Sequence, residues 1–359
     1  MNSALTQGTT GPAAVCLGEL LIDMVPEPAG VPLEEVAAFR PAVGGAPANV
    51  AVGLARLGHP SRFVGKVGED GFGRRAIQVL AEAGVQVDQI RTTAQARTPL
   101  AFVSLSPTGE REFLFYREPG ADSLLTGEEL DRASLERAPI FHLGSISLIH
   151  EPSRTATLTA LRWAHEGGAL ISYDPNLRAP LWPSLAEAHR RLREPLDRTH
   201  ILKASIEELA FLVAPAPDGA ILARPLEPSD GEAASAQLME AYPNLVAVVV
   251  TFGGRGAAVR TRWGWSFVPP FRVPVRDTTG AGDGLVAGLL HWIWRVARRE
   301  GRSPREMAAA LDRDRWYGAV RFGQGVSAVT ITRLGVIPAL PTLQELAAFL
   351  AAQGEMELL

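Results

Sequence analysis

The sequence predicts an α/β protein built on a mostly parallel, doubly wound sheet. Short apolar segments alternate with segments whose apolar residues recur at helical spacing, which is the pattern of strand–helix units. Several of the short segments are apolar almost throughout, as parallel strands covered on both faces should be. Polar or glycine-rich turns follow many of them, and the ligands of such sheets gather at the carboxyl ends of the strands.

The strands and helices follow from these patterns and from the glycines and prolines that bound them. The predicted strands cover residues 13–25 (as one or two strands), 61–65, 140–143, 170–173, 200–203 and 245–251. The predicted helices cover residues 50–58, 71–84, 153–166 and 235–242, and another begins at Asp283. Residues 1–12 are small and polar and predict a loose tail. The proline-rich residues 214–230 predict a surface loop.

Residues 98–117 depart from the alternation of strands and helices. Two segments rich in aromatic and aliphatic residues flank a Pro-Thr-Gly turn at residues 107–109, which is a hairpin signal. We expect this hairpin to form a subdomain or a lid.

The composition limits the possible functions. Of the 359 residues, 47% are hydrophobic and 21% are charged, which is ordinary for a globular protein. A net charge of -4 excludes a general attraction to nucleic acid or anionic membranes. The single cysteine, Cys16, excludes an intrachain disulfide, and its apolar neighbours indicate a buried thiol. No Lys or Arg precedes Arg40, and no apolar run approaches the roughly 20 residues of a membrane helix, so we expect a cytoplasmic protein.

The segment Asp277-Thr-Thr-Gly-Ala-Gly-Asp283 is the strongest functional signal, because it predicts a tight turn that opens an apolar helix. The first N–H groups of a helix have no partner inside it and carry about half a positive charge. Glycines let such a backbone wrap around an anion, phosphate above all. Asp283 could then take a proton from an attacking hydroxyl group. The turn alone fits an ordinary capped helix start equally well.

Other polar turns follow predicted strands and could converge on the same edge of the sheet. A second glycine-rich turn, Gly44–Asn49, opens a helix, and Arg178 ends an Asp-Pro-Asn-Leu-Arg turn where its guanidinium could bind phosphate or sugar oxygens. Glu207 and Glu208 open a helix, and a glutamate at this edge could hold Mg²⁺ through water. The loop Thr251–Gly256 would let a nucleotide lie against the backbone. No P-loop, zinc-binding or nucleophile-elbow motif is present.

Taken together, Gly44-Gly-Ala-Pro-Ala-Asn49 and Asp277–Asp283 resemble the two signature regions of the ribokinase-like (PfkB) sugar kinases, and the resemblance extends from about residue 15 to residue 348. Five stretches are similar to fructokinases in particular: residues 18–23, 111–117, 144–149, 172–178 and 335–341. The resemblance implies one three-layer α/β/α catalytic domain over residues 13–359. It also implies a small β-sheet lid from segments near 20–45 and 98–117, through which many members form homodimers.

The resemblance also implies a role for each residue that matches the family. Asp283 would be the general base, and the backbone N–H groups of Gly280, Ala281 and Gly282 would form the anion hole for the transferred phosphoryl group. The implied sugar-binding residues are Asp23, Gly44, Gly45, Asn49, Arg117, Asn176 and Arg178. The implied nucleotide-site residues are Lys203, Ser205, Glu208, Thr251, Gly253, Gly256, Gln324 and Ser327. Glu208 would hold Mg²⁺ through water, and Asp277 and Thr279 would match the K⁺ site of some members.

The activity implied is an ATP-dependent conversion of D-fructose to fructose 6-phosphate. A kinase for 2-keto-3-deoxygluconate or another ketose stays open, because Arg117 could bind a carboxylate as well as a hydroxyl group. A non-catalytic regulatory member should lose the base or the anion-hole glycines, and this chain keeps them. The chain departs from many members in three places: Ser205, the segment 322–328 with Gln324 and Ser327, and Gly284. The first two departures bear on the nucleotide contacts and the choice of phosphoryl donor.

Overall fold

A computed structural model describes residues 12–359 apart from 28–30, 106–110, 216–218 and 224–225. The predicted N-terminal tail therefore lies almost entirely outside the described residues. No helix in the described part of the chain is both long and apolar enough to cross a membrane.

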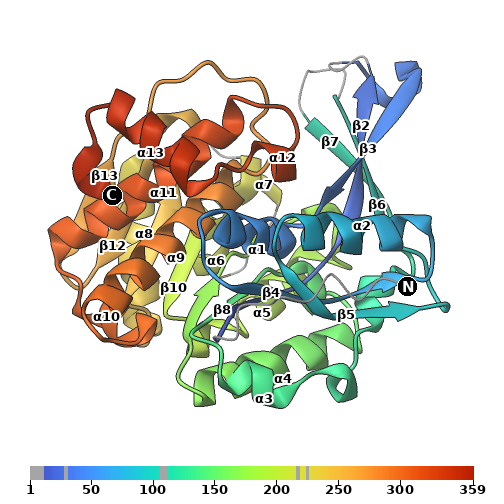
Figure 1. The fold of residues 1–359 in the computed structure, drawn as a ribbon, viewed down its shortest axis with the longest axis horizontal. Helices are drawn as coiled ribbons and strands as arrows, with labels where there is room; N and C mark the ends of the chain where they lie inside the picture. The colour runs from blue at the N-terminus through green and yellow to red at the C-terminus, as the bar shows by residue number, and fades with distance from the viewer. Residues whose placement is uncertain (1–11, 28–30, 106–110, 216–218, 224–225) are drawn as a thin grey trace.

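A nine-stranded main sheet forms the centre of the molecule (Figure 1). Its order is β13-β12-β11-β10-β9-β8-β1-β4-β5, and all neighbours from β11 to β5 run parallel, while β12 and β13 are antiparallel. The strands are β1 (Ala14–Leu17), β4 (Ser61–Gly68), β5 (Gln86–Thr93), β8 (Ile140–Leu143), β9 (Leu170–Tyr173), β10 (Ile201–Ser205), β11 (Ala247–Thr251), β12 (Ala257–Thr261) and β13 (Gly264–Val268). The order reverses at β1, which lies between β4 and β8, and ligands bind at such a switch point.

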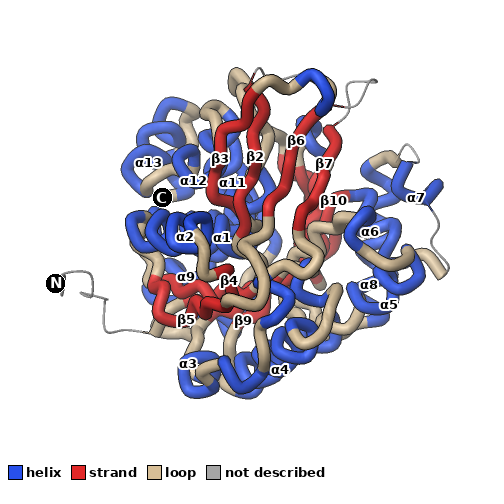
Figure 2. The backbone as a smooth tube through the Cα atoms, turned by 90° about the vertical axis from the view of Figure 1, so that its right-hand side faces the viewer, coloured by secondary structure: helices blue, strands red, loops and turns tan. Residues whose placement is uncertain are grey.

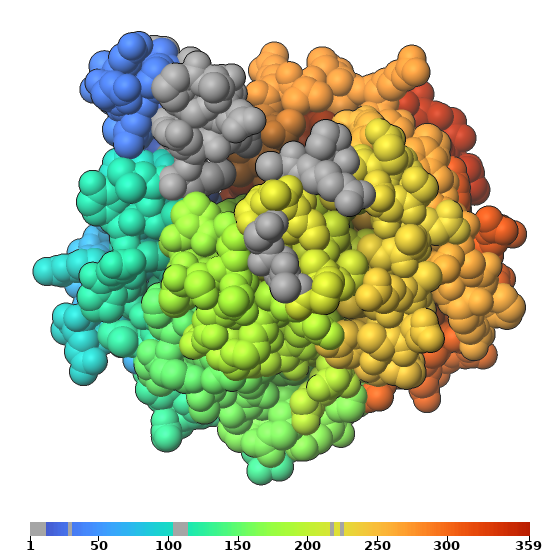
Figure 3. Space-filling view, turned by 180° about the vertical axis from the view of Figure 1, so that it is seen from behind, coloured from blue at the N-terminus to red at the C-terminus, as the bar shows by residue number. Residues whose placement is uncertain are grey.

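Helices cover both faces of the main sheet and produce three layers. They are α1 (Ala46–Arg56), α2 (Gly71–Glu82), α3 (Arg132–Glu136), α4 (Ser153–Glu166), α5 (Leu185–Leu192), α6 (Ile206–Val213), α7 (Gly219–Ala223), α8 (Pro228–Ala241), α9 (Ala281–Arg299), α10 (Pro304–Ala310), α11 (Arg313–Ile331), α12 (Val336–Ala339) and α13 (Leu343–Ala352). Val249 packs into the core beneath α1, α9 and α11, whereas its neighbours Val248 and Val250 pack toward α4, α6 and α8. Figure 3 shows the chain from behind, where its green-to-yellow middle part covers much of the face.

A separate four-stranded small sheet, ordered β3-β2-β6-β7, stands above the main sheet (Figure 2). It consists of β2 (Leu21–Glu27), β3 (Ala38–Gly44), β6 (Leu100–Leu105) and β7 (Arg111–Tyr116). The hairpin expected at residues 98–117 is β6 paired antiparallel with β7. The predicted fold class, a three-layer α/β/α arrangement with a small additional sheet, is therefore confirmed.

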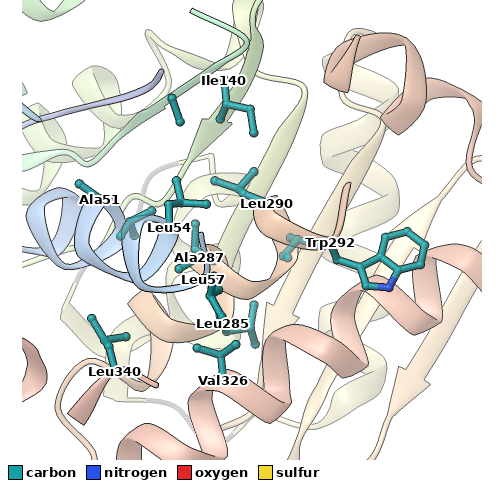
Figure 4. Close-up of a cluster of buried hydrophobic side chains, with 14 of the residues drawn as sticks. Ala51, Leu54, Leu57, Ile140, Leu285, Ala287, Leu290, Trp292, Val326 and Leu340 are labelled. Atoms are coloured by element: carbon teal, nitrogen blue, oxygen red, sulfur yellow. The ribbon is translucent and has the colours of Figure 1, made fainter. Parts of the chain in front are cut away.

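Helix α9 is held between α1 and α11 by close packing (Figure 4). Leu54 of α1, Leu290 of α9 and Val326 of α11 belong to one buried cluster. A Cβ on Gly288 of α9 would come within 2.8 Å of the α11 backbone, so a larger residue there would push the two helices apart. This packing fixes the N-terminus of α9, where the glycine-rich turn lies.

Several predicted elements differ from the structure. Residues 214–230 contain α7 and the first turn of α8. Pro228 at the helix start and Asp230 in a capping box favour the start of α8. Asn49 lies inside α1 and not in the turn before it. Asp277–Asp283 follows an irregular segment and not a strand, whereas Asp23 lies within β2 of the small sheet.

Candidate active site

A cavity of about 250 Å³, the first cavity, lies between the small sheet and the N-terminus of α9. Its lining includes Asp23 of β2, Asn49 of α1, Lys203 of β10, Arg178 and the turn 278–283. These residues come from five separate parts of the chain, and they meet where the strand order reverses. The sequence therefore predicted the convergence of most of these turns on one site.

The glycine turn before α9 has the geometry of an anion site. Gly280 is the N-cap with φ +77, a left-handed conformation that favours glycine, and a Cβ there would lie 2.3 Å from Val336. The N–H of Ala281 donates to the carbonyl oxygen of Thr278 at 3.3 Å, so this amide is loosely engaged within the turn. A Cβ on Gly282 would lie 2.9 Å from Nζ of Lys203, which places the ammonium group beside the helix N-terminus. The turn thus combines helix amides with a cation.

Asp283 lies in the first turn of α9 with its carboxylate facing the first cavity. Its Oδ2 accepts a hydrogen bond of 2.7 Å from Nδ2 of Asn49, a residue 234 positions earlier. Burial raises the pKa of Asp283 from 3.8 to about 6, against the opposing effect of that hydrogen bond. A carboxylate with such a pKa can accept a proton near neutral pH, as a general base must.

Asp23 is a second carboxylate with an altered pKa in the same cavity. Burial raises its pKa from 3.8 to about 7, while the nearby Arg178 guanidinium favours the charged form and Asp283 disfavours it. A Cβ on Gly44 would lie 2.2 Å from Oδ2 of Asp23, so only glycine leaves room for the carboxylate in this position. Gly45, with φ +121, is the N-cap of α1.

Lys203 and Asp174 form a buried ion pair at the boundary of the site. Nζ of Lys203 donates to Oδ2 of Asp174 at 2.9 Å, and the two residues are 8% and 3% exposed. Burial disfavours the ammonium form, but the carboxylates around it, Asp174 foremost, raise the pKa of Lys203 overall. Asp174 Oδ1 also accepts the N–H of Asn176, whose φ of +43 is tolerated best by Asn and Asp among non-glycine residues. The lysine therefore stays charged inside the site.

A second cavity of about 410 Å³ adjoins the first and shares Asn176, Arg178 and Lys203 with it. Both oxygens of Glu208 accept backbone N–H groups at its wall, one from Leu177 at 2.6 Å and one from Ser205 at 2.8 Å. Glu208 thereby joins the turn after β9 to the N-terminus of α6. No cluster of three or more His, Cys, Asp or Glu residues that could hold a metal occurs in the described part of the chain.

Some expected site residues lie elsewhere. Arg117 does not appear in the described lining of either cavity, because its guanidinium forms a buried ion pair with Asp122 at 2.5 Å. Five of the residues expected at the nucleotide site also lie outside the described lining of both cavities: Thr251, Gly253, Gly256, Gln324 and Ser327. Gln324 donates to the carbonyl oxygen of Val268 at 3.0 Å, so its side chain is engaged in the structure.

Asp277 stabilises the turn before α9 through both of its carboxylate oxygens. Oδ1 accepts hydrogen bonds from the backbone and the hydroxyl group of Thr279 at 2.9 and 2.6 Å, and Oδ2 accepts the N–H of Gly335 at 3.1 Å. Thr279 lines the first cavity, whereas Asp277 lines a larger cavity next to it.

Glu19 also lines the first cavity, although no sequence motif indicated a role for it. The available signal was a single acidic residue between two apolar strands, in Cys16-Leu-Gly-Glu-Leu-Leu. The apolar walls Phe115 and Ile146 were also missed, because no pattern distinguishes them from residues of the core.

Comparisons with known proteins agree with this arrangement. Residues 12–343 match the pfkB family carbohydrate kinase model. The chain is 42% identical to "Fructokinase-1" of Zea mays, covering 92% of this chain and 95% of that protein, and 44% identical to "Fructokinase-2" of Solanum habrochaites, covering 92% and 94%. Similar solved structures include the fructokinase of Xylella fastidiosa with bound ATP (TM-score 0.82, 36% identity, 96% of this chain and 99% of that one) and the fructokinase of Vibrio cholerae O395 with fructose, ADP and calcium (TM-score 0.75, 29%, 94% and 99%). The chain therefore belongs to the pfkB family of carbohydrate kinases.

Proposed function

We propose that this chain is an ATP-dependent fructokinase, which converts D-fructose and ATP to fructose 6-phosphate and ADP. The observation that carries the proposal is the position of Asp283 beside the N-terminus of α9, in a cavity whose other walls carry Asp23, Asn49 and Arg178. A base and an anion site therefore lie next to groups that bind hydroxyls. The fructokinases among the similar sequences and structures support the choice of fructose.

In the proposed mechanism, the primary hydroxyl group of the sugar lies against Asp283. Asp283 takes the hydroxyl proton while the oxygen attacks the γ-phosphorus of ATP, the bond from that phosphorus to the bridging oxygen breaks, and ADP leaves. The amides of Gly280, Ala281 and Gly282 stabilise charge on the transferred phosphoryl group. Lys203, held beside Gly282 by Asp174, adds a positive charge at the same place.

The second cavity is the proposed place of the ATP phosphates, because it opens from Lys203 and Arg178 and is walled by Ser205 and Glu208. Mg²⁺ in kinases is bound mainly by phosphates and water with one or two carboxylates, and Glu208 fits that requirement as a carboxylate at this wall. When bound, the ion neutralises charge on the phosphates.

The remaining expected contacts belong to the same proposal. We place the adenine side of ATP near Thr251, Gly253, Gly256, Gln324 and Ser327. A K⁺ ion would lie at Asp277 and Thr279, where the carboxylate supplies negative charge beside the anion site.

The proposal also includes a homodimer formed through the small sheet. Phe115 and Ala101 face the first cavity, so by strand alternation their neighbours Tyr116 and Phe102 face away from it. Tyr116 is 61% exposed, and its ring contacts Phe102 at 5.2 Å between centroids. Leu114, which shares this face, is 44% exposed. Exposed apolar groups on one face indicate an interaction surface.

An assay of ADP release with a panel of sugars tests the proposed activity. The panel holds D-fructose, D-glucose, D-ribose, 2-keto-3-deoxygluconate and adenosine, each with Mg²⁺ and with or without K⁺. D-fructose should give the highest kcat/KM. A clear preference for 2-keto-3-deoxygluconate would instead support the ketose alternative, although Arg117, the residue expected to bind its carboxylate, is paired with Asp122.

A further inference from the structure

We infer that Glu19 is a positioning residue that holds the N-terminus of α1 and thereby keeps Asn49 hydrogen-bonded to Asp283. Glu19 lies in the three-residue link between β1 of the main sheet and β2 of the small sheet. Glu19 takes no part in the proposed phosphoryl transfer. The inference rests on the proposed function only in that Asp283 acts as the base.

The first contact in this chain of interactions joins Glu19 to α1. The N-cap of α1 is Gly45, which has no side chain to satisfy the first helical amides. Oε1 of Glu19 satisfies the first of these amides by accepting the N–H of Ala46 at 2.7 Å, although Glu19 lies 27 residues before Ala46 in the sequence. Burial raises the pKa of Glu19 from 4.5 to about 7, and the hydrogen bond from Ala46 and the helix dipole oppose this effect. The contact therefore replaces the cap that the sequence of α1 lacks.

Close backbone packing reinforces the same contact. A Cβ on Gly45 would lie 2.3 Å from the carbonyl oxygen of Glu19, so the two backbone segments touch. Glu19 is only 3% exposed. Its Oε2 is buried and accepts no hydrogen bond from the described residues. A buried carboxylate oxygen without a partner is costly, so a merely structural cap would be served better by a smaller polar residue.

The second contact joins α1 to the base. Asn49 lies three residues after Ala46 in the first turn of α1, and its Nδ2 donates to Oδ2 of Asp283 at 2.7 Å. The effect of that hydrogen bond is to lower the pKa of Asp283. Displacing the start of α1 would lengthen it, and Asp283 would then take up a proton at a higher pH.

Other charged groups around Asp283 also affect its pKa. Asp174 and Asp23 carry negative charge toward it, while Lys203 and Arg178 carry positive charge. Glu19 lines the same cavity, and Asp122 and Arg117 are the charged groups that act on it. Glu19→Gln removes the charge of Glu19 and keeps an acceptor for the N–H of Ala46, so it separates a direct effect of that charge on Asp283 from the effect that passes through α1 and Asn49.

The test compares kcat/KM for the sugar against pH in wild type, Glu19→Ala, Glu19→Gln and Asn49→Ala. Glu19→Ala should lower kcat/KM about tenfold or more and move the acidic limb to higher pH, because Asp283 loses a hydrogen bond to its charged form. Glu19→Gln keeps an oxygen that can accept the N–H of Ala46, so it should retain the wild-type limb. The double variant with Asn49→Ala should be no worse than Asn49→Ala alone, since both act through one contact.

Asp312→Ala is the matched control, because Asp312 caps α11 by accepting the N–H of Arg315 at 2.9 Å and lies outside the described lining of both cavities. It should lower Tm without moving the acidic limb. Where Glu19→Ala does not fold, Glu19→Asp replaces it, because the shorter side chain keeps the charge but cannot reach Ala46.

A folded Glu19 variant that lacks the contact to Ala46 yet keeps the wild-type acidic limb would overturn the inference. If wild type phosphorylates a sugar other than fructose, only the proposed substrate is wrong, and the limb measured with that sugar still tests Glu19. If no sugar of the panel is phosphorylated, the proposed function fails, and the inference fails with it.

Discussion

Replacing Asp283 with asparagine separates the charge of this residue from its hydrogen bonding. The side-chain oxygen of the new asparagine can still accept a hydrogen bond from Nδ2 of Asn49. In the parent protein, this Nδ2 lies 2.7 Å from Oδ2 of Asp283. The amide cannot take a proton from the sugar. General-base catalysis contributes about 10²- to 10⁴-fold, so kcat should fall by about 10³-fold while the affinity for ATP stays unchanged.

The same substitution should make the protein more stable. The pKa of Asp283 is raised by burial from 3.8 to about 6, and each unit corresponds to about 1.4 kcal/mol, so the buried charge costs about 3 kcal/mol at pH 8. The cost decreases as pH falls through 6, because the folded protein then binds a proton, and it disappears below about 4. Asp283→Asn should therefore raise Tm by about 4 °C at pH 8 for a chain of this length, and by almost nothing at pH 4.

Calorimetry at pH 8, 6 and 4 and an ADP-release assay test the two effects together. Asp122→Asn serves as the control, because this buried acid is paired with Arg117 and its loss should lower Tm. A turnover of Asp283→Asn within tenfold of the parent would refute the role as base. A lower Tm than the parent at pH 8 would show that burial of the carboxylate is not costly and that the physical argument is wrong.

Three further predictions concern neighbouring groups. Gly44→Ala would place a methyl group 2.2 Å from Oδ2 of Asp23 and force the carboxylate to turn, so KM for the sugar should rise about tenfold while KM for ATP is unchanged in steady-state kinetics. Lys203→Met leaves Asp174 buried without its partner, so chemical denaturation should show a loss of about 3–5 kcal/mol, together with a large loss of kcat. Tyr116→Asp places a charge on the exposed face of the small sheet and should give monomers in sedimentation equilibrium; dimers of unchanged affinity would contradict the proposed interface.

The central elements of the fold could be predicted because their sequences allow one interpretation. Residues 140–143 and 170–173 are mainly apolar, with His142 and Ser172 as their polar members, and both are strands with the predicted bounds. The helix 153–166 was also predicted with its observed ends, and Gly167 follows it directly. In such segments, burial and local preference favour the same structure.

The elements that were missed have weaker local signals. Strand β5, with the sequence Gln86-Val-Asp-Gln-Ile-Arg-Thr-Thr93, lies at the edge of the main sheet and is half-exposed, so its apolar residues are sparse. Strands β12 and β13 form a short antiparallel extension after seven parallel strands. Their pairing depends on β11 being at the end of the parallel part, which periodicity does not reveal.

Site residues could be predicted where they lie in one contiguous motif. They could not be predicted where their role depends on a partner that is distant in the sequence or on the path of the chain. Both glycine turns could be recognised locally, and they lie at the N-termini of α1 and α9. The destination of Arg117 could not be found in this way, because whether it faces the cavity or pairs with Asp122 depends on how the chain turns after β7. Glu19 shows the same limit, since its partner Ala46 lies 27 residues away.

The balance of charge in the first cavity suggests how substrate binding and catalysis are linked. Burial raises the pKa of Asp23 and Asp283, so both carboxylates lie in a place that disfavours their charge. A sugar that fills about 250 Å³ removes further water, which would raise both values unless its hydroxyl groups donate to the carboxylates. A sugar whose hydroxyl groups donate hydrogen bonds to both carboxylates keeps Asp283 ionised and able to act as a base. A sugar that donates no hydrogen bond to Asp23 leaves a carboxyl group of the site protonated. Discrimination between sugars should therefore appear in kcat as well as in KM.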